Sequence, residues 1–207
     1  MNKNSLIVKV CGMLDEENMR AVEALGADWM GFIFYPHSKR YVGRQLTYLP
    51  QHAKKVGVFV NETIETILQK VEEYRLDIVQ LHGDESPQLC QQLRQHNIQV
   101  MKAFGISNRL PTDIIAKYEG VCHYYLFDTQ TTNYGGSGKK YDWSILQKYR
   151  GSTPFLLSGG IGLDDVEAIK AFSNPMCIGV DINSKFELSP ANKDIQSIQQ
   201  FIKSLKQ

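Results

Sequence analysis

Residues 6–19 read LIVKVCGMLDEENM, a short apolar run followed by a glycine turn and an acidic segment suited to the start of a helix. The same order recurs along the chain, where runs rich in Val, Ile and Phe alternate with amphipathic stretches. Eight apolar runs are predicted as strands, at 6–11, 29–34, 56–60, 78–82, 100–104, 124–128, 155–158 and 177–181. Helices are expected near 15–25, 44–54, 63–75, 86–96, 111–119, 142–149, 164–172 and 191–205. The repeating unit is therefore a strand followed by a helix.

This alternation indicates a parallel sheet, because each crossover between parallel strands needs a connection about as long as a helix. Eight units in 207 residues average about 26 residues each, which suits a closed eight-stranded barrel at the short end of its size range. A doubly wound sheet would require G-x-G-x-x-G after the first strand, where the chain has Cys11-Gly12-Met13. We therefore predict an α/β protein in which residues 1–207 form a single-domain (β/α)8 TIM barrel.

The composition is that of an ordinary globular protein, with 43% hydrophobic and 22% charged residues. Lys and Arg number 23 and Asp and Glu 22, so the net charge of +1 gives no support to nucleic-acid binding. No apolar run approaches about 20 residues, the length that a membrane helix needs. The four cysteines stand far apart, at 11, 90, 122 and 177, which argues against a metal site or a disulfide framework. We expect a cytoplasmic protein with free thiols and without a membrane or nucleic-acid partner.

Several predicted strands carry polar residues on one face only. Side chains alternate along a strand, so Val8 and Val10 share one face of the first run while Lys9 and Cys11 share the other. The same alternation points four further polar residues into the barrel near its C-terminal mouth: Gln80, His82, Asp128 and Asp181. Burying such a set costs several kcal/mol unless its members are paired, and barrel enzymes keep their chemistry at this mouth. The set therefore indicates a functional site.

Taken singly, each of these residues also has a structural interpretation. Cys11 would suit a small buried hydrophobe, as would the other three cysteines. Asp128 could cap a helix or pair with a cation, and His82 could be a hydrogen-bonded core histidine. The functional interpretation is preferred because it accounts for the whole set at one end of the barrel.

The loops after the last two strands have the composition of a phosphate site. Residues 158–162 read SGGIG, and Gly159 and Gly160 would let backbone N–H groups approach a phosphate closely before a helix begins. Barrels commonly bind phosphate with the loops after strands seven and eight. Asn183 and Ser184 follow the eighth run and are candidates to complete the site.

Two further loops carry polar motifs. The basic segment 37–41 places Arg40 where a guanidinium could hold a carboxylate through two hydrogen bonds, the alternative being a surface charge cluster. Residues 135–139 read GGSGK and resemble a P-loop only superficially, since Lys140 stands where Ser or Thr is required. We interpret that segment as a mobile lid or, alternatively, as a solvated loop.

Together these segments resemble the phosphoribosylanthranilate isomerase family over nearly the whole chain. The motifs that carry the resemblance are KVCG at 9–12, GFIFYP at 31–36 with SKR at 38–40, VGVFVN at 56–61, VQLHG at 79–83, FDT at 127–129, YGGSGK at 134–139 and LSGG at 157–160. The resemblance implies an Amadori rearrangement of N-(5-phosphoribosyl)anthranilate to 1-(2-carboxyphenylamino)-1-deoxyribulose 5-phosphate in L-tryptophan biosynthesis. It implies no metal or other cofactor.

Site roles follow from the same resemblance. It makes Cys11 the general base and Asp128 the general acid, gives Arg40 the anthranilate carboxylate, and gives Gly159 and Gly160 the phosphate. Asp181, Asn183 and Ser184 complete the predicted substrate site. The family commonly has Ser-Ser-Gly in the loop after the eighth strand, whereas this chain has Asn183-Ser184-Lys185. Loss of the glycine removes a close backbone approach to phosphate, which the charge of Lys185 could offset.

The chemistry sets two requirements on protonation. Asp128 can protonate the sugar ring oxygen only if its pKa is raised by burial or by a neighbouring negative charge. Cys11 acts as a base more readily if its thiol pKa is lowered, and Lys9, two residues earlier on the same face, is the candidate to lower it.

Two other functions remain open from the residues themselves. Another phosphosugar barrel, such as an epimerase or the related isomerase of histidine synthesis, would share the phosphate loops. A barrel that only binds a phosphorylated ligand would need neither Cys11 nor Asp128. In each case the partner is a small phosphorylated molecule, and we expect a monomer or a weak homodimer.

Overall fold

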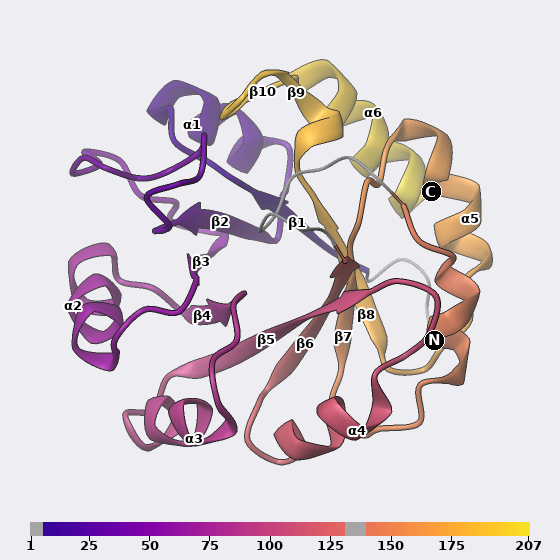
Figure 1. The fold of residues 1–207 in the computed structure, drawn as a ribbon. Coiled ribbons are helices and arrows are strands. Elements are labelled where there is room, and N and C mark those ends of the chain that lie inside the picture. Colours follow the sequence, from indigo (N-terminus) through magenta and orange to yellow (C-terminus); the bar gives the residue numbers. More distant parts are fainter. Residues whose placement is uncertain (1–5, 131–139) are drawn as a thin grey trace.

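The computed structural model describes residues 6–130 and 140–207. Eight parallel strands close into a barrel in chain order, which confirms the predicted (β/α)8 fold (Figure 1). The strands are β1 (Ile7–Cys11), β2 (Trp29–Ile33), β3 (Lys54–Phe59), β4 (Ile78–Leu81), β5 (Gln99–Ile106), β6 (Tyr124–Thr129), β7 (Phe155–Leu157) and β8 (Cys177–Ile182). β1 pairs with β8 and closes the ring, with Lys9 opposite Asp181. The predicted lid at 135–139 lies outside the described residues.

Helices surround the barrel (Figure 1). They are α1 (Glu16–Ala24), α2 (Ile64–Tyr74), α3 (Pro87–Gln95), α4 (Thr112–Ile115), α5 (Val166–Ala171) and α6 (Ile195–Lys206), with the 3-10 turns η2 (Ala116–Tyr118), η3 (Trp143–Lys148), η4 (Leu163–Asp165) and η5 (Ser184–Phe186). The longer helices begin at side chains that accept hydrogen bonds from backbone N–H groups: Asp15, Thr63, Ser86 and Asp194. Across the described part of the chain, none of the helices is long and apolar enough to span a membrane.

The helix expected at 44–54 is wrong, because that segment forms an irregular loop between β2 and β3. Two glutamates of α1 satisfy its backbone instead of helical hydrogen bonds. Glu23 accepts from the N–H groups of Gln51, His52 and Ala53 at 2.7, 2.6 and 3.1 Å. Glu16 accepts from the N–H of Thr47 at 2.8 Å. Pro50 also disfavours a helix through this segment.

The helix expected at 191–205 begins later than predicted. A short antiparallel hairpin precedes it, made of β9 (Glu187–Ser189) and β10 (Asn192–Lys193). Ala191 takes the left-handed φ of 67° at the turn, and Asp194 then caps α6. This hairpin turns Glu187 and Lys193 inward, where both side chains are buried.

Apolar residues pack in two separate layers. One lies between the strands and the helices and includes Val8, Val10 and Phe127. The other fills the interior of the barrel towards the N-terminal ends of its strands: Trp29, Val56, Ile78, Met101, Ala103, Leu126 and Leu156. Because alternate side chains share a face, Gln80 and Asp128 follow Ile78 and Leu126 on the interior face. The polar set therefore occupies the C-terminal end of the barrel.

Candidate active site

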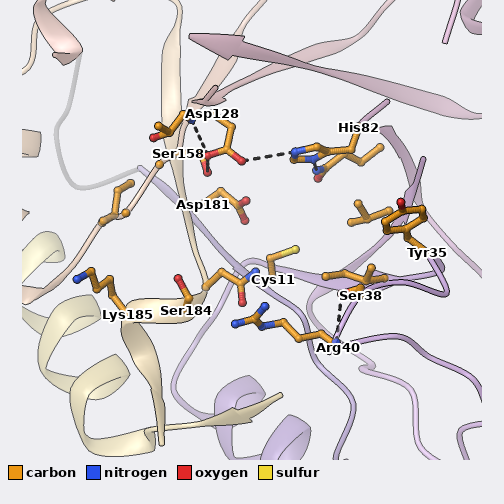
Figure 2. A pocket seen from close by; sticks show the side chains of 18 of the residues that line it. Cys11, Tyr35, Ser38, Arg40, His82, Asp128, Ser158, Asp181, Ser184 and Lys185 are labelled. Carbon is orange, nitrogen blue, oxygen red and sulfur yellow. Dashed lines mark hydrogen bonds and ion pairs between the residues drawn. The ribbon is translucent and has the colours of Figure 1, made fainter. Parts of the chain in front are cut away.

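A cavity lies at the C-terminal ends of the strands, and Figure 2 shows side chains of residues that line it. All of the predicted site residues line this cavity: Cys11, Arg40, Asp128, Gly159, Gly160, Asp181, Asn183 and Ser184. Ser38, His82 and Lys185 line it as well. The structure thus brings together residues from opposite ends of the chain, as the barrel interpretation requires.

Cys11 lies on the cavity floor beside a buried ion pair. Lys9 and Asp181 face each other across β1 and β8, with 2.8 Å between Lys9 Nζ and Asp181 Oδ1. Gly31 of β2 makes room for the thiol, because a Cβ at that position would lie 2.7 Å from Cys11 Sγ. The glycine and the ion pair together fix where the sulfur can sit.

The electrostatics of this cluster correct one expectation. Burial raises the pKa of the Cys11 thiol; the charges of Lys9 and Lys193 oppose that rise without cancelling it. The pKa of Lys9 is itself raised, because Asp181 and Cys11 outweigh the burial that would lower it. Lys9 therefore favours the thiolate as predicted, but it does not bring the thiol pKa below its ordinary value in the free protein.

Asp128 pairs with His82 on the opposite wall. Their side chains are 3.5 Å apart between Asp128 Oδ2 and His82 Nε2, as drawn in Figure 2. The amide nitrogen of Gln80 donates to His82 Nδ1 at 2.9 Å, which leaves the imidazole proton on Nε2, facing the carboxylate. The Gln80 amide oxygen is buried without a hydrogen-bond partner among the described residues. Rotation of that amide would let Gln80 accept from a doubly protonated His82.

The pKa of Asp128 departs from the direction that we expected. Burial acts to raise it, but the hydrogen bond and electrostatic attraction of His82 and the N–H of Thr129 lower it below the ordinary value. The Thr129 N–H donates at 2.8 Å, and the Ser158 hydroxyl donates at 3.4 Å. In the free protein Asp128 is therefore a carboxylate, and its use as an acid needs a further negative charge nearby.

Arg40 lies in the cavity, and a residue that the sequence interpretation missed holds it there. Glu187 accepts from Arg40 Nε at 2.8 Å and from Nη2 at 2.5 Å, and Lys193 donates to the same carboxylate at 2.7 Å. Lys193 was missed because the sequence pattern predicts a helix over 191–205, and Glu187 was missed because it lies just before that range in no predicted element. The turn-forming residues Ser189 to Asn192 are the signal that would have revealed the hairpin.

The glycine turn after β7 has the backbone expected of a phosphate site. Gly159 and Gly160 have φ of 97° and 62°, values that favour glycine. A Cβ on Gly159 would collide with Thr129 Oγ1 and would lie 3.2 Å from Tyr141. Figure 2 shows Ser184 and Lys185 on this side of the cavity and Tyr35 and Ser38 on the other, with Cys11 between them.

A sequence model of the N-(5'phosphoribosyl)anthranilate (PRA) isomerase family matches residues 8–204. The chain is 49% identical over 202 residues to an N-(5'-phosphoribosyl)anthranilate isomerase of Phocaeicola vulgatus, covering 98% of each protein. A crystal structure of phosphoribosyl anthranilate isomerase from Thermotoga maritima matches with a TM-score of 0.84 at 38% identity, covering 97% of this chain and 98% of that one. Another phosphoribosyl anthranilate isomerase structure, in complex with reduced 1-(o-carboxyphenylamino)-1-deoxyribulose 5-phosphate, matches with a TM-score of 0.80 at 34% identity over 97% and 98%.

Proposed function

The chain belongs to the N-(5'-phosphoribosyl)anthranilate isomerase family, and from that premise we propose how its cavity performs the Amadori rearrangement of tryptophan biosynthesis. The observation that carries the proposal is the convergence of Cys11 and Asp128 on one cavity, with Arg40 at one end and Gly159 and Gly160 at the other. A base, an acid and two anion-binding ends are what an intramolecular proton transfer on a carboxylated sugar phosphate needs.

The first step opens the ribose ring. Asp128 gives its proton to the ring oxygen, the C1–O bond breaks, and the nitrogen lone pair forms a C1=N iminium. Asp128 must be protonated for this, although its pKa is lowered in the free protein. The carboxylate and phosphate of the bound substrate add negative charge and exclude water, which raises the pKa of the carboxyl group. The N–H of His82, 3.5 Å away, faces the carboxylate that is left after the transfer and stabilises it.

The second step moves the proton from C2. The Cys11 thiolate takes it, the C2–H electrons form a C1=C2 bond, and the iminium nitrogen recovers its lone pair. The resulting enolamine gains a proton at C1 and loses its enol proton to give the ketone. Lys9, whose ammonium stays charged beside Asp181, stabilises the thiolate at the moment it is needed. Each acid–base group of this kind contributes about 10²–10⁴-fold to the rate.

The remaining cavity residues are assigned to binding the substrate, including its carboxylate and phosphate ends. We assign the anthranilate carboxylate to the free edge of Arg40 and the phosphate to Gly159, Gly160, Asn183 and Ser184. Asp181 uses Oδ1 to hold Lys9, and its other oxygen is assigned to a ribose hydroxyl. Lys185 adds charge at the phosphate end, in place of the backbone approach that a glycine would allow.

The deciding experiment follows the loss of phosphoribosylanthranilate fluorescence, with the substrate generated in situ. We expect rapid decay with the natural protein and a loss of about 10²–10⁴-fold in kcat for Cys11→Ser and for Asp128→Asn. Unchanged thermal unfolding of both variants is the control. No decay above background with folded protein would leave another phosphosugar isomerase. Full activity of both variants would reject the assigned acid and base.

The same assignment suggests a domain organisation, an oligomeric state and a cellular location for the protein. We propose that residues 1–207 work as one catalytic domain on a small phosphorylated substrate, as a monomer or weak homodimer in the cytoplasm. All four cysteines are buried free thiols, which supports a reducing compartment. Sedimentation velocity at micromolar concentration tests the oligomeric state, and a stable higher oligomer would contradict it.

A further inference from the structure

Two buried charges of the β9–β10 hairpin lie directly behind Arg40. The Glu187 side chain is 4% exposed and that of Lys193 is fully buried. Glu187 holds the Arg40 guanidinium through two hydrogen bonds, of 2.8 and 2.5 Å, and receives the Lys193 ammonium at 2.7 Å. The Ala191 N–H donates to the same Glu187 oxygen at 3.1 Å. The Glu187 carboxylate therefore accepts hydrogen bonds from Arg40 and from two residues of the hairpin, Ala191 and Lys193.

Lys193 extends this pairing to the phosphate side of the cavity. Its Nζ donates to Asn183 Oδ1 at 2.7 Å, so one ammonium joins the loop after β8 to the carboxylate that holds Arg40. The backbone of Lys193 is fixed in turn by Asn18 of α1, which bonds both its N–H and its C=O at 2.9 Å. Lys193 thus cannot shift without disturbing α1.

The side chains of Arg40 and Asn183 also pack against the same glycine, Gly12. A Cβ on Gly12 would lie 2.5 Å from Arg40 Cδ and 3.0 Å from Asn183 Oδ1, so both side chains pack against its backbone. A guanidinium has five N–H donors, and Glu187 uses two of them. The edge formed by Nη1 and the second N–H of Nη2 remains for a carboxylate, held in one orientation before the ligand arrives.

We propose that Glu187 and Lys193 are positioning residues that set the distance between the two anionic ends of the substrate. Glu187 orients Arg40 for the carboxylate, and Lys193 ties Glu187 to Asn183 at the phosphate end. This inference rests on the proposed function, since it takes Arg40 and Asn183 as the residues that contact the substrate. The alternative is that the buried pair only stabilises the fold.

The test compares two ligands that differ at one end. The first is reduced 1-(o-carboxyphenylamino)-1-deoxyribulose 5-phosphate, and the second is the same compound made from aniline, which lacks the carboxylate. Both are titrated calorimetrically into the natural protein, Glu187→Gln and Lys193→Met. Because preorganisation of Arg40 serves only the carboxylate, Glu187→Gln should raise the Kd of the first ligand about tenfold and that of the second less than about twofold. Lys193→Met should weaken both ligands, since it releases Asn183 too.

Several controls keep the outcomes apart. If the natural protein binds neither ligand, the proposed function fails before the variants are considered. If Glu187→Gln weakens both ligands equally, or neither, the positioning role is overturned and the pair is structural. Lys55→Met removes an ion pair at the opposite end of the barrel and should leave both Kd values unchanged. Should Lys193→Met fail to fold, Glu187→Met/Lys193→Met removes both charges together, which buried pairs tolerate better, and should weaken both ligands.

Discussion

The two ends of the barrel interior use the same strands for opposite purposes. Towards the N-terminal ends, the interior is an apolar layer that includes Ile78 and Leu126. Two residues further along the same faces stand Gln80 and Asp128, which line the cavity. One step of the strand alternation therefore separates core from active site. The apolar layer is stabilised by packing. The C-terminal end of the interior, which we call the polar end, is stabilised by ion pairs and hydrogen bonds between its polar side chains.

Buried charges at the C-terminal end are also paired on the side of the strands that faces the helices. Lys102 of β5 is 3.2 Å from Glu85 and also donates to the carbonyl of Gly83 at 2.7 Å. Both charged side chains are almost fully buried. Since an unpaired buried charge costs more than an apolar substitution of the same size, the polar end should be the less tolerant of the two regions.

Lys9→Met should have the largest effect, because it leaves Asp181 buried without its cation. We expect the free energy of unfolding to fall by about 3–5 kcal/mol. The substitution also removes a charge that lowers the pKa of Cys11, so that pKa should rise further above its ordinary value. Because the pKa of Asp128 is lower than that of Cys11, the acid limb of the kcat/KM profile reports Asp128 and the alkaline limb reports Cys11. The alkaline limb should therefore move to higher pH. Urea unfolding and a pH–rate profile measure the two effects; an unmoved alkaline limb would reject the role of Lys9.

Leu126→Ala tests the apolar layer and should reduce the free energy of unfolding by an amount similar to that of Lys9→Met. Leu126 is fully buried in the inner layer, so truncation should cost about 2–5 kcal/mol. It should leave kcat within about twofold, because a cavity there removes no charge partner of Cys11 or Asp128. Urea unfolding and the fluorescence assay together measure this. A loss of kcat comparable to that of the polar variants would show that the two ends are mechanically coupled and would break the comparison.

His82→Asn should act on pH dependence more than on stability. His82 lowers the pKa of Asp128, so its removal should raise that pKa and move the acid limb of kcat/KM to higher pH. The sign follows because Asp128 is a carboxylate above its pKa in the free protein. Gln80→Leu, which cannot hold the imidazole tautomer, should shift the same limb less. An acid limb unchanged in both variants would remove His82 from the mechanism.

The contrast between the two ends also explains what could be read from the sequence. The alternation of Val8, Lys9, Val10 and Cys11 predicts both the strand and its two faces, because period-two patterning is local. The loop at 44–54 could not be predicted this way, since distant carboxylates of α1 satisfy its backbone. The pKa directions of Cys11 and Asp128 depended on burial and on partners such as His82, which only the closed barrel brings together.

Lys185→Ala should have the smallest effect, because it removes a charge only at the exposed rim of the cavity and does not restore the glycine of the family. Lys185 lines the cavity at the phosphate side but is exposed to solvent, where charge is screened. Its removal should raise KM about two- to fivefold at low ionic strength, and this ratio should shrink as salt is added. Lys39→Ala is the matched control, an exposed lysine near Arg40 that does not line the cavity. A KM that stays constant in low salt for Lys185→Ala would mean that the lysine does not take over from the missing glycine, so that the phosphate is bound by Gly159, Gly160, Asn183 and Ser184 without it.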